Sequence, residues 1–431
     1  MEQVKRIEYF NDIINQGAPI GSMDLWYKQN RRTFSVYNIS LKFLIYNRFN
    51  GRIASLVKSY EKETGHELDP TDRDDIKIIE KFLWQSNEGS NKATESSIHD
   101  QGQLKYGIVT KDGVIIDGNR RAMILRKVYD EEPEVYFRAV VLDEALADNP
   151  REIMRLETTY QMGEDAKVDY NPIEKYLKVK DMLETGFTCK DVGKAMGEPE
   201  SIIQEYQQIM SLMDEYLDQL EYSGIYTRLD KTEDLFINLN KVIRRWENGS
   251  GRVKWGFKQN DLSDFKTITY DLIRYVYNSP KGIEAKDIRG HLTRNSENSF
   301  FAHEKIWKDF SDRHFDKVDP ITNAEKSIDE FREEAGSRDL SGILKQRDSA
   351  WASEVDSEVK NNFYRSRDSL ENHLDKAEPL KLLESALSKL EAVDVASSAF
   401  LDDNNVFNKV DEVRKKSDSY KKSIETHRKR R

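Results

Sequence analysis

Several features that would identify a class of protein at once are absent from this sequence. Its 431 residues include a single cysteine, Cys189, which excludes an internal disulfide and fits a reducing cytoplasm. No apolar run approaches the roughly 20 residues needed to cross a bilayer. The first residues include acids and lack the apolar stretch of a secretory signal. We therefore expect a cytoplasmic protein that does not enter a membrane.

The sequence also lacks the short motifs of the commonest catalytic sites. It contains no G-x-x-x-x-G-K-[ST] phosphate loop, no H-E-x-x-H pair and no Cys/His spacing that would bind zinc. Its 68 lysines and arginines are outnumbered by 78 aspartates and glutamates, which gives a formal net charge of -10. So acidic a chain is not a general nucleic-acid binder, and any such contact requires a local basic patch.

What the sequence does contain is centred on residues 106–127. β-branched residues flank an Asp-Gly pair at 112–113, which predicts a hairpin. The second strand leads through Gly118 into an apolar pattern that predicts a helix, with Arg120 and Arg121 in its first turn. Helix N-termini offer free N–H groups, and arginines recognise phosphate oxygens. This arginine turn, residues 117–121, is a candidate phosphate site; the alternative is an ordinary turn followed by surface arginines.

Hydrophobic patterns elsewhere predict mainly helices. Alternation at 41–45 predicts a half-buried strand, and the run at 135–143 predicts another. The polar residues 86–96 predict a flexible loop. Asn171, followed by proline and then Glu174 at the third helical position, predicts a strong helix start.

Residues 187–213 have the form of a helix-turn-helix. A DNA-reading helix presents Arg, Lys, Asn or Gln to bases and phosphates. This one carries Glu198, Glu200 and Glu205, and no lysine or arginine occurs in residues 195–227. Because acids repel the DNA backbone, the pattern favours a structural or protein-binding role.

The last part of the chain is highly charged. Leu380, Leu383, Leu387 and Leu390 have heptad-like spacing over a short run, which predicts a helical hairpin or an oligomer contact. The ending KKSIETHRKRR is basic, and it fits either a solvated tail or a contact with DNA backbone.

The order of these motifs resembles the N-terminal domain of the ParB partition proteins and the wider ParB/sulfiredoxin superfamily. Ser97-Ile98 and Gly102 match the segment that precedes the family's hairpin, and the arginine turn matches its GERRxxA-type nucleotide box, with Asn119 in place of Glu. The asparagine loop, residues 47–52, matches the family's N-P-x-Q-P-R segment. Glu157 is the best match to the glutamate of its ENxxR box, in which Thr158 and Gln161 replace Asn and Arg, and NPIE opens a helix at the same point.

The resemblance implies an α+β fold with a small mixed sheet in a ParB/sulfiredoxin-like N-terminal domain. A helix-turn-helix-like domain and a mostly α-helical C-terminal region would follow. The expected segments are a helical lead-in (1–35), the nucleotide-binding domain (36–165) with a helical insertion (53–94), a helical domain with a degenerate helix-turn-helix (166–247) and an all-α region (248–431).

The resemblance also implies a function. The chain would bind ATP or CTP with Mg²⁺, hydrolyse it, and act as a homodimeric switch in a DNA-associated system such as partition, phage defence or DNA modification. Two alternatives stay open: a non-enzymatic DNA-associated adaptor or regulator, and a ParB-like nuclease. A protein partner is a further expectation, bound through the helical C-terminal region. The implied nucleotide-binding residues are Asn47, Asn50, Arg52, Gly102, Gly118, Arg120 and Arg121; the implied catalytic residues are Asp117, Asn119 and Glu157, with Glu157 also the metal ligand.

Overall fold

The computed structural model of the chain describes residues 2–163, 171–279, 282–335 and 339–429. The chain divides into two compact units, residues 1–363 and 364–431. The expected segment boundaries after residues 35 and 247 lie inside the first unit, and the one after residue 165 lies outside the described residues. Within the described ranges, no helix is both long and apolar enough to cross a membrane.

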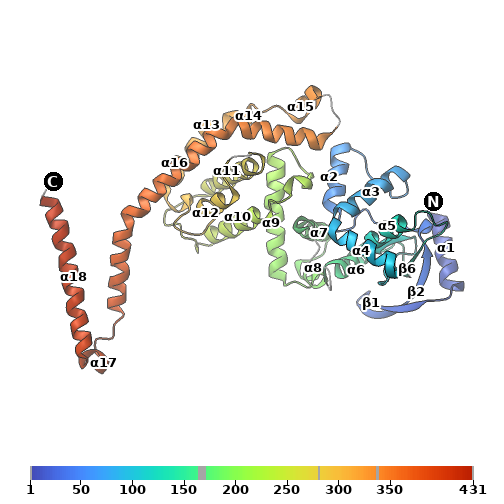
Figure 1. Cartoon of the computed structure of the whole chain (residues 1–431), viewed down its shortest axis with the longest axis horizontal. Coiled ribbons are helices and arrows are strands. Elements are labelled where there is room, and N and C mark those ends of the chain that lie inside the picture. Colours follow the sequence, from blue (N-terminus) through green and yellow to red (C-terminus); the bar gives the residue numbers. More distant parts are fainter. Residues whose placement is uncertain (1, 164–170, 280–281, 336–338, 430–431) are drawn as a thin grey trace. The chain divides into compact units, whose positions relative to one another are not determined.

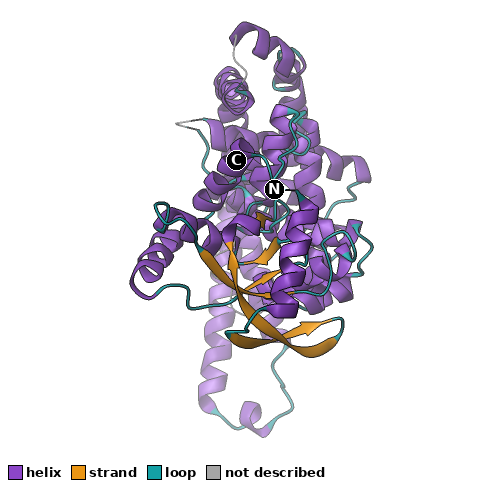
Figure 2. Ribbon diagram, turned by 90° about the vertical axis from the view of Figure 1, so that its right-hand side faces the viewer, coloured by secondary structure: helices purple, strands orange, loops and turns teal. Residues whose placement is uncertain are grey.

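A six-stranded mixed sheet organises the first unit, as Figure 2 shows in orange, so the predicted α+β class with a mixed sheet is confirmed. Its strand order is β1-β2-β6-β4-β5-β3. The pairs β3–β5 and β4–β6 are parallel, and the other pairs are antiparallel. The strands are β1 (Gly21–Tyr27), β2 (Asn30–Ser40), β3 (Ile45–Tyr46), β4 (Gly107–Val109), β5 (Val114–Asp117) and β6 (Tyr136–Val141).

Helices cover both faces of the sheet, which explains why its central strands read as unbroken apolar runs rather than alternating ones. Ile115 points into a core built with five helices, and its neighbour Ile116 points into a second core built with one. The five helices are α1 (Gln3–Gln16), α2 (Ala54–Thr64), α3 (Arg73–Gln85), α4 (Glu88–Gln101) and α5 (Asn119–Val128), and the single helix is α6 (Pro150–Thr158).

The rest of the first unit is helical (Figure 1). The segment interpreted as a helix-turn-helix contains two successive helices: Thr188 caps α8 through a reciprocal bond with Asp191, and Gly197 at φ 67° ends that helix before α9. The described helices are α7 (Pro172–Glu184), α8 (Cys189–Met196), α9 (Glu200–Gln219), α10 (Glu233–Glu247), α11 (Gln259–Asn278), α12 (Ala285–His291), α13 (Glu304–Lys317), α14 (Asp319–Asn323), α15 (Ile328–Ala335) and the first part of α16 (Leu340–Glu391).

The second unit contains the end of α16, then α17 (Ser398–Leu401) and α18 (Asn404–Lys429). The predicted helical character is confirmed. Leu380, Leu383, Leu387 and Leu390 are 47–61% exposed, so the structure leaves their heptad-like face open. The final two residues of the basic ending lie outside the described residues.

Three local predictions were wrong. Residues 41–43 form a 3-10 turn instead of a strand, and the long strand β2 precedes them. The lead-in is helical only through Gln16, after which β1 and β2 pair as a hairpin. The polar segment 86–96 is mostly helix α4, because the Asn87 side chain caps it and Asn91 is buried against α3.

Candidate functional site

The candidate site is built where two parallel strands end side by side. In the register of β3 and β5, Ile45 pairs with Val114 and Tyr46 with Ile115. Parallel neighbours carry their carboxyl ends to the same edge of a sheet, where open α/β sheets commonly bind ligands. The asparagine loop follows β3 at this edge, and the arginine turn follows β5. Two segments about 70 residues apart in the sequence are therefore neighbours.

Asn119 joins the arginine turn to the asparagine loop. Its Oδ1 accepts a hydrogen bond from the backbone N–H of Asn47 at 3.0 Å, and its Nδ2 donates to the carbonyl of Ile115 at 2.9 Å. The side chain is 3% exposed. An amide supplies both the acceptor and the donor that these partners require, whereas a carboxylate supplies acceptors only. Asparagine therefore satisfies both partners at this position, which glutamate could not do.

Glu157, at the end of α6, lies beneath the asparagine loop. Its Oε1 accepts from Asn47 Nδ2 and from the Gly51 N–H, both at 3.3 Å, and its Oε2 accepts from Lys178 Nζ at 3.0 Å. The Glu157 and Lys178 side chains are each 4% exposed. Burial raises the pKa of the Glu157 carboxyl, and the Lys178 ammonium opposes that rise. The carboxylate thus fixes the loop and balances one buried cation.

The residues present do not fit a magnesium ion held by Glu157. Mg²⁺ is usually held by one or two carboxylates together with water and phosphate oxygens. Both oxygens of Glu157 already accept hydrogen bonds, one of them from an ammonium group. Among the described residues, no group of three His, Cys, Asp or Glu side chains is placed to hold a metal. The other candidate carboxylate, Asp117, is paired with Arg121 at 2.6 Å.

A second buried carboxylate lies next to this cluster, and sequence reasoning assigned it only a helix-capping role. Glu174 of α7 accepts hydrogen bonds from Ser55 of α2, from Oγ at 2.5 Å and from the backbone N–H at 3.1 Å. Burial raises the pKa of Glu174 to about 7, against the lowering effect of these bonds. Asn171 caps α7 as predicted. No local signal in the sequence marks Ser55 as the partner, because the pair spans 119 positions.

The arginines of the turn are held by protein groups in this structure. Arg121 donates to the carbonyls of Lys105 and Tyr106 at 2.6 and 2.9 Å and pairs with Asp117. Arg120 Nε donates to Asn91 Oδ1 of α4 at 2.6 Å. Asn119 therefore brings the arginine turn to the asparagine loop, as predicted. The guanidinium group of Arg121 binds residues in and just before the β4–β5 hairpin, and that of Arg120 binds Asn91 of the insertion.

The remaining predicted residues have structural roles that are visible in the backbone. Asn50 Oδ1 accepts from the N–H of Arg52 at 3.0 Å, which closes the asparagine loop. Gly118 has φ 105°, and a Cβ there would lie 2.6 Å from the Phe137 ring. Gly102, with φ 69°, ends α4 and would meet no atom within 4 Å. Glycine at 118 thus allows close packing against Phe137, while Gly102 only reverses the chain.

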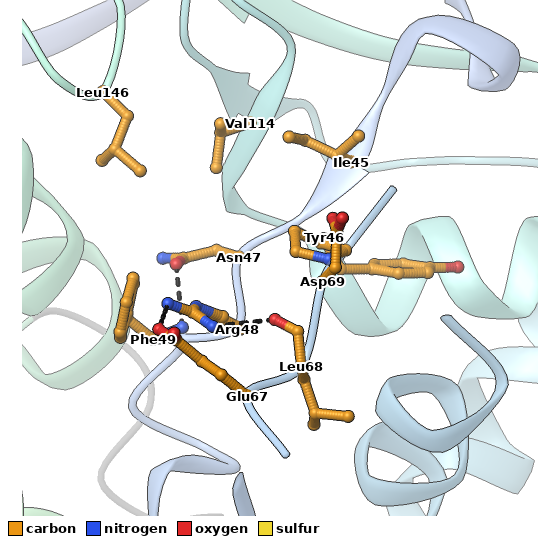
Figure 3. Close-up of a pocket in the computed structure, with 11 residues that line it drawn as sticks. Ile45, Tyr46, Asn47, Arg48, Phe49, Glu67, Leu68, Asp69, Val114 and Leu146 are labelled. Atoms are coloured by element: carbon orange, nitrogen blue, oxygen red, sulfur yellow. Dashed lines mark hydrogen bonds and ion pairs between the residues drawn. The ribbon is translucent and has the colours of Figure 1, made fainter. Parts of the chain in front are cut away.

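A hollow of about 370 Å³ opens beside the asparagine loop (Figure 3). Of the predicted residues, only Asn47 lines it. Its charged lining consists of Arg48, Glu67 and Asp69, and Arg48 is already paired with Glu67. One base against two acids does not favour a triphosphate, so this hollow is not a phosphate site. The exposed ring of Phe49 gives the hollow an aromatic wall.

Comparison of the chain with models of protein families finds no match, and comparison with curated proteins finds none either.

Proposed function

We propose that this chain is a ParB-like protein that binds a nucleoside triphosphate between the asparagine loop and the arginine turn. One observation supports this most directly: the Asn47–Asn119 hydrogen bond joins the two motifs at the edge where β3 and β5 end. The phosphates would meet the N-terminus of α5, where backbone N–H groups and the helix dipole favour anions. The base would lie toward Phe49, whose ring is 55% exposed.

Binding requires the two arginines to exchange partners. The Arg121–Asp117 pair is partly exposed, with side chains 19% and 29% accessible. A pair of this kind contributes about 1 kcal/mol or less, so a triphosphate with several negative charges can displace Asp117. Arg120 would exchange its bond with Asn91 for a bond to a phosphate oxygen. The nucleotide would then remove the contact between Arg120 and α4. We propose this change in the attachment of α4 as the switch.

The contacts of Glu157 favour binding without cleavage, the adaptor alternative. A catalytic carboxylate needs a lone pair free for a metal or a water molecule, and three of the roughly four lone-pair positions of Glu157 accept hydrogen bonds from Lys178 and the asparagine loop. Coordination of a metal by Glu157 would compete with its buried contact with Lys178. A role in partition, phage defence or DNA modification, and a homodimeric state, are further parts of the proposal that come from the resemblance.

Isothermal titration calorimetry with ATP and CTP, each with and without Mg²⁺, tests the proposal. We expect one of the two nucleotides to bind, and Arg120→Ala and Arg121→Ala each to weaken binding at least tenfold, because charge-assisted bonds to phosphate contribute roughly 1.5–3 kcal/mol. Lys127→Ala, which removes a cation from the opposite end of α5, is the matched control. Phosphate release under the same conditions separates a hydrolase from a binding protein. No heat with either nucleotide would refute the proposal.

A further inference from the structure

A concentration of positive charge lies far from the candidate nucleotide site. Residues 241–258 and 282–294 together contain nine lysines and arginines against three acids, in a chain whose formal net charge is -10. Helices α10 and α12 carry most of these bases and pack against each other and against α11. The local excess is the kind of basic patch that an acidic chain needs if it is to contact a polyanion.

The bases converge on one hollow of about 520 Å³, here called the α10–α12 hollow. Lys241 and Arg245 come from α10, Lys286 and Arg289 from α12, and Arg294 from the segment that follows α12. Among the residues that the structure describes, no acidic side chain lines the hollow.

Only part of this charge is balanced by the protein. Arg289 pairs with Asp234, and Lys286 pairs with Glu284 at 2.8 Å. Within the described ranges, no carboxylate lies within ion-pair distance of Lys241, Arg245 or Arg294. Like charges around one concavity repel each other unless an anion enters it. A bound anion would interact favourably with all of these bases at once.

A buried hydroxyl group provides an independent indication of a ligand. Thr293 lines the same hollow and is 3% exposed. In the part of the chain that the structure describes, its Oγ1 has no hydrogen-bond partner. Buried polar atoms without a partner are uncommon in native proteins and require a specific explanation. A phosphate oxygen in the hollow would accept from the neighbouring guanidinium groups, and a rotation of the Thr293 side chain toward the hollow would give its buried hydroxyl a phosphate acceptor.

We propose that the α10–α12 hollow binds a backbone phosphate of a nucleic-acid strand. A linear polyanion is favoured over a single small phosphate because the basic surface continues beyond the hollow. The backbone N–H of Arg252 donates to Asn295 Oδ1 at 3.0 Å, which holds the basic segment 252–254 beside it. Arg244 adds an exposed base on α10. Contacts of lysine and arginine with phosphate oxygens carry no sequence information directly, so the proposed recognition is of the backbone. This proposal uses none of the contacts of the nucleotide site.

Fluorescence anisotropy of the full chain with labelled duplex DNA, single-stranded DNA and single-stranded RNA, over a range of salt, tests the proposal. The double variant Arg245→Ala/Arg294→Ala should weaken binding at least tenfold, and the slope of log K against log salt should fall in magnitude by about two. The control Arg73→Ala/Lys81→Ala removes two exposed bases of α3 and the same net charge, and it should leave both quantities unchanged.

A second variant separates the hollow from bulk charge. Thr293→Val keeps the size of the side chain and removes the hydroxyl, so it should weaken nucleic-acid binding without lowering the melting temperature of the free protein. An unchanged salt slope in the arginine double variant, equal losses in the α3 control, or the absence of nucleic-acid binding at 50 mM salt would each overturn the proposal. Displacement of the strand by polyglutamate as readily as by unlabelled DNA would overturn the assignment to nucleic acid.

Discussion

Replacing Lys178 by methionine is the sharpest test of how the candidate site is held together. The Glu157–Lys178 pair is almost fully buried, and its 3.0 Å contact is the only one from a cation among the described contacts of Glu157. Methionine keeps the length and apolar stem of lysine but leaves Glu157 without its counter-ion. Breaking one partner of a buried pair costs about 3–5 kcal/mol. We expect Lys178→Met to lower the free energy of unfolding of the first unit by that amount at pH 8.

The loss should depend on pH in a direction fixed by Glu157. Burial raises its folded-state pKa above the unfolded value, and removing Lys178 takes away the group that opposes the rise. For a raised carboxyl pKa, the folded state holds the proton that the unfolded state releases, so stability falls as pH rises. Lys178→Met should therefore be closer to wild type at pH 5 than at pH 8.

The double variant Glu157→Gln/Lys178→Met completes a thermodynamic cycle. Removing both charges leaves no uncompensated ion, so the double variant should be more stable than Lys178→Met alone, with a coupling energy of about 2–3 kcal/mol. Urea unfolding at pH 5 and pH 8, followed by fluorescence and circular dichroism together, gives the free energies if the two transitions coincide. Additive losses, or a Lys178→Met deficit that does not change with pH, would refute the assignment of a buried ion pair.

Three further outcomes follow from the same region. Because the folded-state pKa of Glu174 is about 7 and lies above the unfolded value, the wild type should lose roughly 3 kcal/mol of unfolding free energy between about pH 4.5 and pH 7, and Glu174→Gln should not. Urea unfolding that shows the same change of free energy with pH in both proteins would contradict this. Gly118→Ala should destabilise by about 2–5 kcal/mol through backbone strain and overlap with Phe137, whereas Gly65→Ala, also at positive φ but with open space around it, should cost about 1 kcal/mol. Asn91→Leu should cost about 2–3 kcal/mol and loosen α4 in hydrogen-exchange measurements, because it leaves two backbone carbonyls of α3 and Arg120 without their amide partner; equal exchange in both proteins would contradict the role given to Asn91.

Local chemistry was enough to predict the elements that depend on short-range signals. The Asp-Gly turn gave the β4–β5 hairpin, the apolar pattern after Gly118 gave α5, and the Asn-Pro start gave α7. Each of these signals acts within a few residues of the element that it specifies. The α+β class and the mixed sheet, expected from the resemblance, are likewise present.

The sequence could not reveal which side chains satisfy one another across the fold. Arg120 and Arg121 were expected to point together at a ligand, yet Asn91 and Asp117 engage them. Glu157 was expected to hold a metal, yet its partner is Lys178, which no motif singled out. No local pattern marks this lysine as buried, because its neighbours one turn away on α7 are Glu174, Lys175, Asp181 and Met182.

These buried contacts give α7 a position from which it can respond to the candidate site. Through Lys178 it holds Glu157, which fixes the asparagine loop, and through Glu174 it holds Ser55 at the start of α2. The same helix packs directly against α8 and α9, the two helices of the segment interpreted from sequence as a helix-turn-helix. A ligand that moved the asparagine loop would disturb the hydrogen bonds of Glu157. Through Lys178, it would also disturb α7, against which α8 and α9 pack. Closely packed protein interiors respond to a displaced side chain by rearranging discrete contacts rather than by gradual strain. We therefore expect a movement of the asparagine loop to be accompanied by a rearrangement of the contacts of α7 with α8 and α9.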